Sequence, residues 1–134
     1  MLAPSGSNLA AESTSQAIDR LVDVFPAEQQ LLVRSRLASL LEGVLYQMLV
    51  PSKDGDRRLV AVEIMLGSPA VRSLIREGKT HQLPNTIHTS RTAGMQTMDQ
   101  ALVELYRGGT ISEQDVLLRC LDPDEIKRQL GLVI

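Results

Sequence analysis

The stretch LVAVEIMLGSPAVRSLIREG, residues 59–78, contains the two local patterns that decide the fold of this chain. Its first part, 59–66, alternates like a β-strand and is apolar on nearly both faces, which predicts a strand that is covered on both sides. Its second part begins with Ser68 as a helix N-cap and Pro69 at the first helical position. Gly78 provides a left-handed helix end. The stretch therefore predicts a strand followed directly by a short helix.

A second apolar segment, 45–50, precedes this strand. The connector between the two segments, 51–58, is polar and contains Gly55, which is typical of an antiparallel hairpin. We therefore expect one hairpin over about residues 45–66.

Two helices are expected before the hairpin. Residues 1–15 are rich in Ser, Ala and Gly, and we interpret them as a flexible leader whose last serines can cap a helix from Gln16. Phe25-Pro26 ends that helix, and Pro26 starts the next one. The apolar face of this second helix comprises Val33, Leu37, Leu40, Leu41, Val44 and Leu45.

The remainder reads as a helical bundle over residues 69–131. Residues 79–87 are expected to form a helix, with Pro84 in its first turn or at a break. A further helix runs from Met95 to Leu105, and others begin at Ser112 and Asp122. The predicted fold class is α/β and helix-rich, with residues 16–134 forming one segment.

Composition restricts the classes of function. The chain has 134 residues, of which 43% are hydrophobic and 22% charged, enough for a single domain. A formal net charge of −2 argues against nucleic-acid binding and against adsorption to anionic lipid. No apolar run approaches the ~18–20 residues of a membrane span. One cysteine, Cys120, predicts a reducing, cytoplasmic setting, and we expect it to pack on the apolar face of a helix.

Familiar catalytic and metal-binding patterns are absent from the sequence. It contains neither a G-x-x-x-x-G-K-[ST] phosphate loop nor a G-x-G-x-x-G turn. Residues 53–56 are better interpreted as a turn than as a calcium loop. His81 and His88 lack further ligands at matching spacing, so we expect surface histidines and no bound metal.

Glu63 is an acid in the middle of an apolar strand. An unpaired buried carboxylate would be costly, so we expect it to form a structural ion pair with an arginine, or the strand to lie at an edge. This interpretation is favoured over a functional role.

The helix after the strand carries the most specific pattern. Its residues are Ala70, Val71, Arg72, Ser73, Leu74, Ile75, Arg76 and Glu77. Val71, Leu74 and Ile75 form an apolar stripe, while the two arginines lie four positions apart on another face. That spacing fits a solvated basic side, and it also fits a pair that grips a carboxylate or phosphate of a neighbouring chain.

Three blocks of the sequence, residues 16–26, 60–82 and 94–100, resemble the C-terminal part of the PilT family. These are the type IV pilus retraction ATPases of the secretion-ATPase superfamily. Ala70–Glu77 is similar to the family signature AIRNLIRE, with Val71 and Ser73 replacing Ile and Asn. The resemblance covers nearly everything from Gln16 onward.

The resemblance implies the distal part of a RecA-like ATPase domain, in which the signature helix is needed for retraction without contacting ATP. It also implies a cytoplasmic homohexamer at the inner face of the cell membrane, acting on an inner-membrane platform protein with ATP and Mg²⁺ as cofactors. The family's Walker A, Asp box and Walker B would precede Met1. Its His box would fall at residues 10–13, which read Ala-Ala-Glu-Ser.

The chain is therefore expected to contribute subunit packing and force transmission in such a motor, and to be inactive alone. The alternative is a stand-alone helical interaction module that docks an acidic partner through Arg72 and Arg76.

Overall fold

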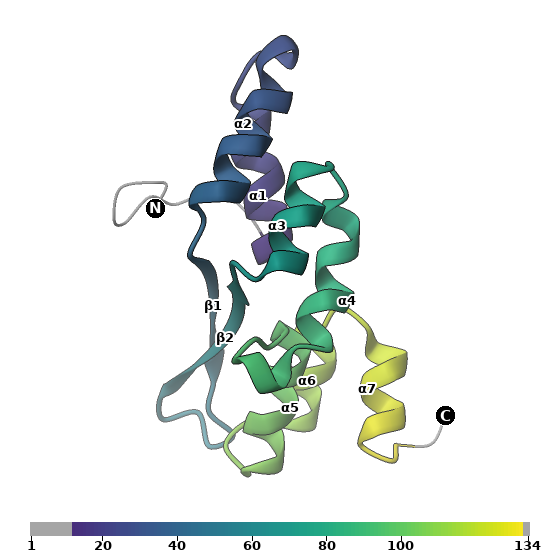
Figure 1. Ribbon diagram of the computed structural model, residues 1–134. Helices are drawn as coiled ribbons and strands as arrows, with labels where there is room; N and C mark the ends of the chain where they lie inside the picture. Colours follow the sequence, from purple (N-terminus) through teal and green to yellow (C-terminus); the bar gives the residue numbers. More distant parts are fainter. Residues whose placement is uncertain (1–11, 133–134) are drawn as a thin grey trace. The chain divides into compact units, whose positions relative to one another are not determined.

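The computed structural model describes residues 12–132, which form two compact units. The first unit contains the described residues up to Tyr46 together with Ile64–Gln96, and the second contains Gln47–Glu63 and the residues from Thr97 onward. Residues 12–132 form seven α-helices and two strands. Figure 1 labels these elements and colours them along the sequence. Within this part of the chain, no helix has the length and apolarity needed to cross a bilayer.

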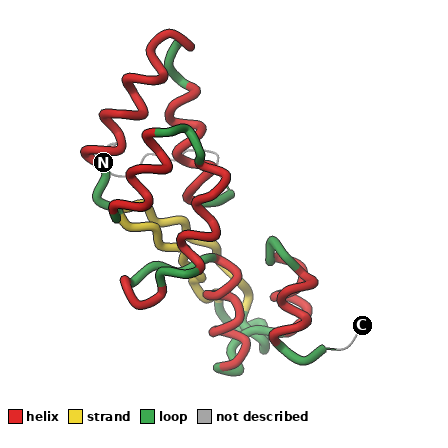
Figure 2. Tube along the Cα trace, turned by 45° about the vertical axis from the view of Figure 1, so that its right-hand side comes forward, coloured by secondary structure: helices red, strands yellow, loops and turns green. Residues whose placement is uncertain are grey.

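Within residues 12–132, one antiparallel hairpin separates two helices before it from the helices after it in sequence. Strand β1 is Gly43–Pro51, strand β2 is Arg58–Leu66, and the two lie side by side (Figure 2). The register is fixed at the base by the Gly67 amide donating to the Glu42 carbonyl at 2.9 Å. At the tip the Ser52 amide donates to the Arg57 carbonyl at 2.8 Å. The predicted hairpin is confirmed.

The two faces of β2 differ more than the sequence predicted. Ala61, Glu63 and Met65 are buried, whereas Val60 and Leu66 are exposed. The expectation of cover on both sides is wrong for residues 12–132, because side chains of this part of the chain cover one face of the hairpin. Apolar character alone did not distinguish the two faces.

The first unit packs its helices around one aliphatic core. Its helices are α1 (Thr14–Asp23), α2 (Ala27–Leu40), α3 (Pro69–Arg76) and α4 (Leu83–His88), joined in part by the 3₁₀ turns Thr80–Gln82 and Arg91–Ala93. The core residues are Ile18, Val22, Leu37, Ala38, Leu41, Met65, Val71, Ile75, Leu83, Ile87 and Met95. The low aromatic content of the sequence thus corresponds to a core of branched aliphatic and methionine side chains.

Helix α1 begins at Thr14, inside the stretch that was expected to be leader. Ser13 caps it, since its hydroxyl oxygen accepts a hydrogen bond from the Gln16 amide at 3.1 Å. The expected leader is therefore two residues too long at its end, and residues 1–11 lie outside the described part of the chain. The 3₁₀ turn Thr80–Gln82 is joined to α1, because the Thr80 hydroxyl donates a hydrogen bond to Asp19 at 2.6 Å.

Helix α2 ends at Leu40, so the expected continuation through Val44 and Leu45 is wrong. Leu41 already has extended backbone, with ψ 124°, and the ladder with β2 begins at Glu42. Val44 and Leu45 therefore lie in strand β1, where they pair with β2. The solvent side of α2 also carries leucines: Leu31 is 74% exposed, Leu32 56% and Leu40 76%.

The expected helix over residues 79–87 is a 3₁₀ turn followed by α4. Pro84 lies in the first turn of α4. At that position its missing N–H has no intrahelical partner to lose, so the proline is accommodated without breaking the helix.

The second unit contains helices α5 (Met98–Arg107), α6 (Glu113–Arg119) and α7 (Pro123–Gln129). The helix expected from Met95 starts instead at Met98, because Thr97 and Gln100 form a capping box. Cys120 was expected on a helical face and is the C-cap of α6. It is half-buried, and burial, followed by the nearby Asp99 carboxylate, raises the pKa of its thiol.

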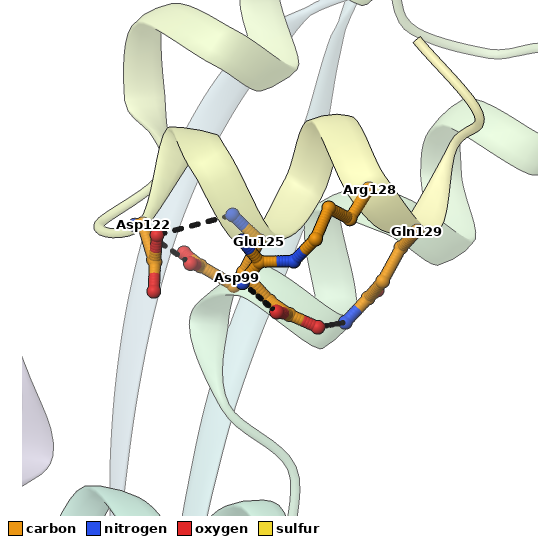
Figure 3. A network of polar contacts seen from close by, with 5 residues as sticks. All are labelled: Asp99, Asp122, Glu125, Arg128 and Gln129. Atoms are coloured by element: carbon orange, nitrogen blue, oxygen red, sulfur yellow. Dashed lines mark hydrogen bonds and ion pairs between the residues drawn. The ribbon is translucent and has the colours of Figure 1, made fainter. Parts of the chain in front are cut away.

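Asp99 ties the start of α5 to the start of α7 (Figure 3). Its carboxylate accepts a hydrogen bond from the Asp122 amide at 3.1 Å, which Figure 3 shows. It also accepts one from the Leu121 amide at 2.8 Å. Asp122 in turn caps α7 by accepting from the Glu125 amide at 3.1 Å. At the other end, Arg107 donates to the Gln129 carbonyl at 3.2 Å. The two helices are thus joined at both ends by polar contacts.

We expect Asp99→Ala to destabilise the chain by about 1 kcal/mol, because two amides at the start of α7 lose their acceptor. The matched control is Asp124→Ala, which removes an exposed carboxylate from the first turn of α7. Urea unfolding followed by circular dichroism measures both. Equal destabilisation by the two variants would show that the contact in Figure 3 contributes nothing specific.

Candidate functional site

Helix α3 follows the hairpin after a single residue, Gly67, and a cap. The Ser68 hydroxyl accepts a hydrogen bond from the Val71 amide at 3.2 Å, and Pro69 occupies the first helical position. At the other end Gly78 has φ +72°, as predicted for a left-handed stop. The predicted boundaries of this helix are therefore confirmed.

The apolar stripe of α3 packs into the core of the first unit. Val71 and Ile75 are fully buried there, and Leu74 is partly buried against the same cluster. The helix is consequently held along its length by aliphatic contacts, with its opposite side open to solvent at Ala70 and Arg76.

Arg72 donates to three backbone carbonyls that belong to two segments of the chain. Its Nε donates to the Gly67 carbonyl at 2.7 Å, and its Nη1 donates to the carbonyls of Ala38 and Ser39, each at 2.8 Å. The last two carbonyls belong to the final turn of α2, where helical carbonyls lack intrahelical partners. We call this arrangement of Gly67, Arg72 and the carbonyls of Ala38, Ser39 and Leu41 the α2–α3 junction.

Gly67 makes the close approach at the junction sterically feasible. A Cβ atom at this position would lie 2.2 Å from the Leu41 carbonyl oxygen and 3.0 Å from Nη2 of Arg72. The first of these contacts is with backbone, so it cannot be relieved by rotating a side chain. Glycine is required at this position by the proximity of the chain that leaves α2.

The C-terminal end of α3 carries a small charged group. Glu77 accepts a hydrogen bond from the Ser73 hydroxyl at 2.8 Å and pairs with Lys79 at 3.1 Å. The Ser73 bond, and then Lys79, lower the pKa of the Glu77 carboxyl. A lowered pKa means that these contacts favour the fold at neutral pH and weaken as the pH falls through the carboxyl range.

The two arginines of α3 do not form a common binding fork. Arg72 is half-buried and its donors are directed at α2 and Gly67, whereas Arg76 is exposed. These contacts of Arg72 do not favour the hypothesis that the pair jointly grips an external carboxylate, which stays a prediction. Helical spacing placed both side chains on one face, but the proximity of the α2 carbonyls turns one of them inward.

Glu63 is 5% exposed, on the covered face of β2. Its Oε2 accepts a hydrogen bond from the Met98 amide at 3.0 Å, at the first residue of α5. A helix N-terminus presents unpaired amides and a partial positive charge, so it is a suitable partner for a carboxylate. The arginine partner that we expected for this acid stays a prediction.

The remaining candidates from the sequence lie on the surface. Asp54 accepts hydrogen bonds from the Ser52 hydroxyl at 2.6 Å and the Asp56 amide at 3.0 Å, an arrangement typical of a turn. His81 and His88 are exposed. Across residues 12–132, no three His, Cys, Asp or Glu side chains are grouped to hold a metal ion.

Two features of the site were missed at the level of sequence. The Thr97-x-x-Gln100 pattern is a capping box that could have been recognised before the structure. The contacts of Arg72 with α2 have no local signal, since they join residues 33 and 34 positions apart.

Comparison with known proteins relates this fold and α3 to pilus motors. The type IV pilus retraction ATPase PilT of Pseudomonas aeruginosa is 43% identical over 116 residues, which are 87% of this chain and 33% of that protein. A twitching motility protein of Neisseria gonorrhoeae is 42% identical over 106 residues, covering 79% of this chain and 28% of its own length. No family model matches the chain.

A solved structure supports the same relationship. The crystal structure of the pilus retraction motor PilT with bound ADP superposes with a TM-score of 0.77 at 36% identity, and the match covers 90% of this chain and 33% of that chain. The chain thus spans about a third of the length of the relatives it matches.

The chain, with a hairpin followed by the signature helix α3 and further helices, matches the C-terminal region of pilus retraction ATPases. The resemblance seen in the sequence is therefore confirmed. More specifically, the chain matches the C-terminal region of the type IV pilus retraction ATPase PilT.

Proposed function

We propose that this chain acts as the C-terminal part of a type IV pilus retraction motor for twitching motility. In that role it contributes to the packing of subunits and transmits ATP-driven movement through α3. The observation that carries the proposal is the placement of α3. Its apolar stripe is buried in the first unit and Arg72 secures it to α2, so displacement of α3 would carry the rest of that unit with it.

The sequence by itself lacks a phosphate loop, and stabilising the transition state of ATP hydrolysis requires its amides, its lysine and Mg²⁺. We therefore expect the isolated chain to be inactive, with ATP and Mg²⁺ bound by the remaining part of a full-length motor. Calorimetric titration of the 134-residue chain with Mg²⁺–ATP is expected to give no heat of binding. Micromolar affinity together with turnover would contradict this part of the proposal.

The partners that follow are neighbouring subunits of a homohexamer and an inner-membrane platform protein, with the motor at the inner face of the cell membrane. Arg76 is the α3 side chain best suited to such a contact, because it is exposed and charged at the end of the helix.

Arg76→Ala is expected to lower pilus retraction at least tenfold while ATP turnover stays within twofold. The measurement uses a full-length PilT motor whose C-terminal third is replaced by this segment. Arg36→Ala, which removes an exposed arginine from α2, is the matched control and is expected to leave both rates unchanged. Normal retraction by the Arg76 variant would contradict a special role for the exposed side of α3.

The alternative, a stand-alone module that docks an acidic partner through both arginines, is less well supported. Arg72 donates to three carbonyls of its own chain, and releasing it would leave the carbonyls at the end of α2 without these donors. An acidic partner would then contact Arg76 alone. Binding through two arginines, on which this alternative was based, would be lost.

A further inference from the structure

The α2–α3 junction joins three segments through the Arg72 side chain and the Gly67 backbone. Arg72 contacts the last turn of α2 through Nη1 and the start of α3 through the Gly67 carbonyl. The Gly67 amide donates to the Glu42 carbonyl, which is the last rung at the base of the hairpin. The end of α2, the base of the hairpin and the start of α3 are therefore connected by a short, continuous set of hydrogen bonds.

This set of contacts requires an arginine. A guanidinium offers several N–H donors in a fixed plane, so it can reach the Gly67 carbonyl from one edge and the α2 carbonyls from the other. A lysine has one nitrogen on a flexible chain and cannot span both edges. The positive charge also lies at the C-terminus of α2, where the helix dipole favours a cation.

We propose that Arg72 is a positioning residue that fixes the direction in which α3 leaves the hairpin, and that it does so by capping the C-terminus of α2. The two arginines of the signature helix then have separate roles: Arg72 acts within the subunit, and Arg76 faces outward. This inference rests on the proposed function insofar as it gives α3 a mechanical role, but its geometric part can be tested on this chain alone.

The first test uses the full 134-residue chain and amide hydrogen exchange followed by NMR. Arg72→Lys keeps the positive charge and removes the planar guanidinium. We expect the backbone amides of residues 67 and 72 to exchange at least tenfold faster in this variant than in the wild-type chain. Arg76→Lys is the matched control and is expected to change these rates less than twofold. Unchanged exchange in Arg72→Lys would overturn the proposal.

A second measurement needs no variant, so it holds even if Arg72→Lys fails to fold. In the wild-type chain the Nε proton of Arg72 is expected to give a distinct side-chain signal that exchanges at least tenfold more slowly than the Nε proton of Arg76. Equal exchange of the two Nε protons would overturn the proposal independently of stability.

The third test separates this inference from the proposed function. In the PilT chimera we expect Arg72→Lys to lower retraction at least tenfold with ATP turnover within twofold. If the exchange results are as expected and retraction is unaffected, the positioning role stands and force transmission through α3 is refuted. If the exchange results fail, the positioning role is refuted whatever the motor does.

Discussion

Replacing Gly67 with alanine is expected to destabilise the chain by about 3 kcal/mol. The added methyl group would lie 2.2 Å from the Leu41 carbonyl oxygen, so the backbone at the end of α2 or at the start of α3 must move. That movement would also lengthen the Gly67–Glu42 and Arg72–Gly67 hydrogen bonds. Urea denaturation at 25 °C, followed by circular dichroism, gives the free energy of unfolding.

Gly108→Ala is the matched control for this prediction. Gly108 has α-helical backbone with φ −75°, and a Cβ there would lie at an ordinary distance of 3.4 Å from the Glu104 carbonyl oxygen. Alanine at this position is expected to be neutral or to stabilise the chain by up to about 1 kcal/mol. A Gly67→Ala variant as stable as Gly108→Ala would contradict the tight approach at the junction.

Glu63→Leu is expected to destabilise the chain by about 2 kcal/mol, because it leaves the Met98 amide at the start of α5 without this acceptor. Leucine is no smaller than glutamate, so the loss does not come from a cavity. Unfolding in urea, combined with hydrogen exchange at the Met98 amide, measures the effect.

Glu63→Gln serves as the control for the charge. Glutamine retains an oxygen that can accept from Met98, so we expect this variant to lose less than half as much free energy as Glu63→Leu. Equal losses would show that the negative charge, and not the hydrogen bond at the start of α5, is what stabilises the fold here.

Local patterns gave most of the secondary structure. Helix caps at Ser13, Ser68, Ser112 and Asp122 were readable because the side chain that accepts the hydrogen bond lies within three residues of the amide that donates it. The hairpin was readable for a similar reason, since a polar connector with Gly55 at φ +80° joins two apolar segments.

The errors came from competition between elements distant in the sequence. Leu45 fits the apolar face of α2, yet pairing with β2 places it in a strand. Met95 fits the face of α5, yet it packs in the core of the first unit. Helical periodicity cannot tell these outcomes apart, because the choice depends on which partner the residue meets.

The candidate site residues stay a prediction, and their arrangement could not be read from the sequence. The sequence singled out Arg72, Arg76 and Glu63, and the structure gives each of them a defined setting. Their settings depend on Ala38, Ser39 and Met98, which lie more than 30 positions from their partners and have no distinctive chemistry of their own. Contacts with backbone carbonyls and amides cannot be predicted from a sequence pattern, because every residue has these groups.

The three leucines on the solvent side of α2 bear on how the chain can be prepared and labelled. Leu31 and Leu40 each expose about three quarters of their surface, so polar replacements there should change folding free energy by no more than ~0.5 kcal/mol. Lysine, glutamate and glutamine match leucine closely in helix propensity. Leu31 is therefore suitable for improving solubility or for attaching a fluorophore, because it lies seven positions before the nearest carbonyl that holds α3. Leu40 is not, because it lies between Ser39 and Leu41 of the α2–α3 junction.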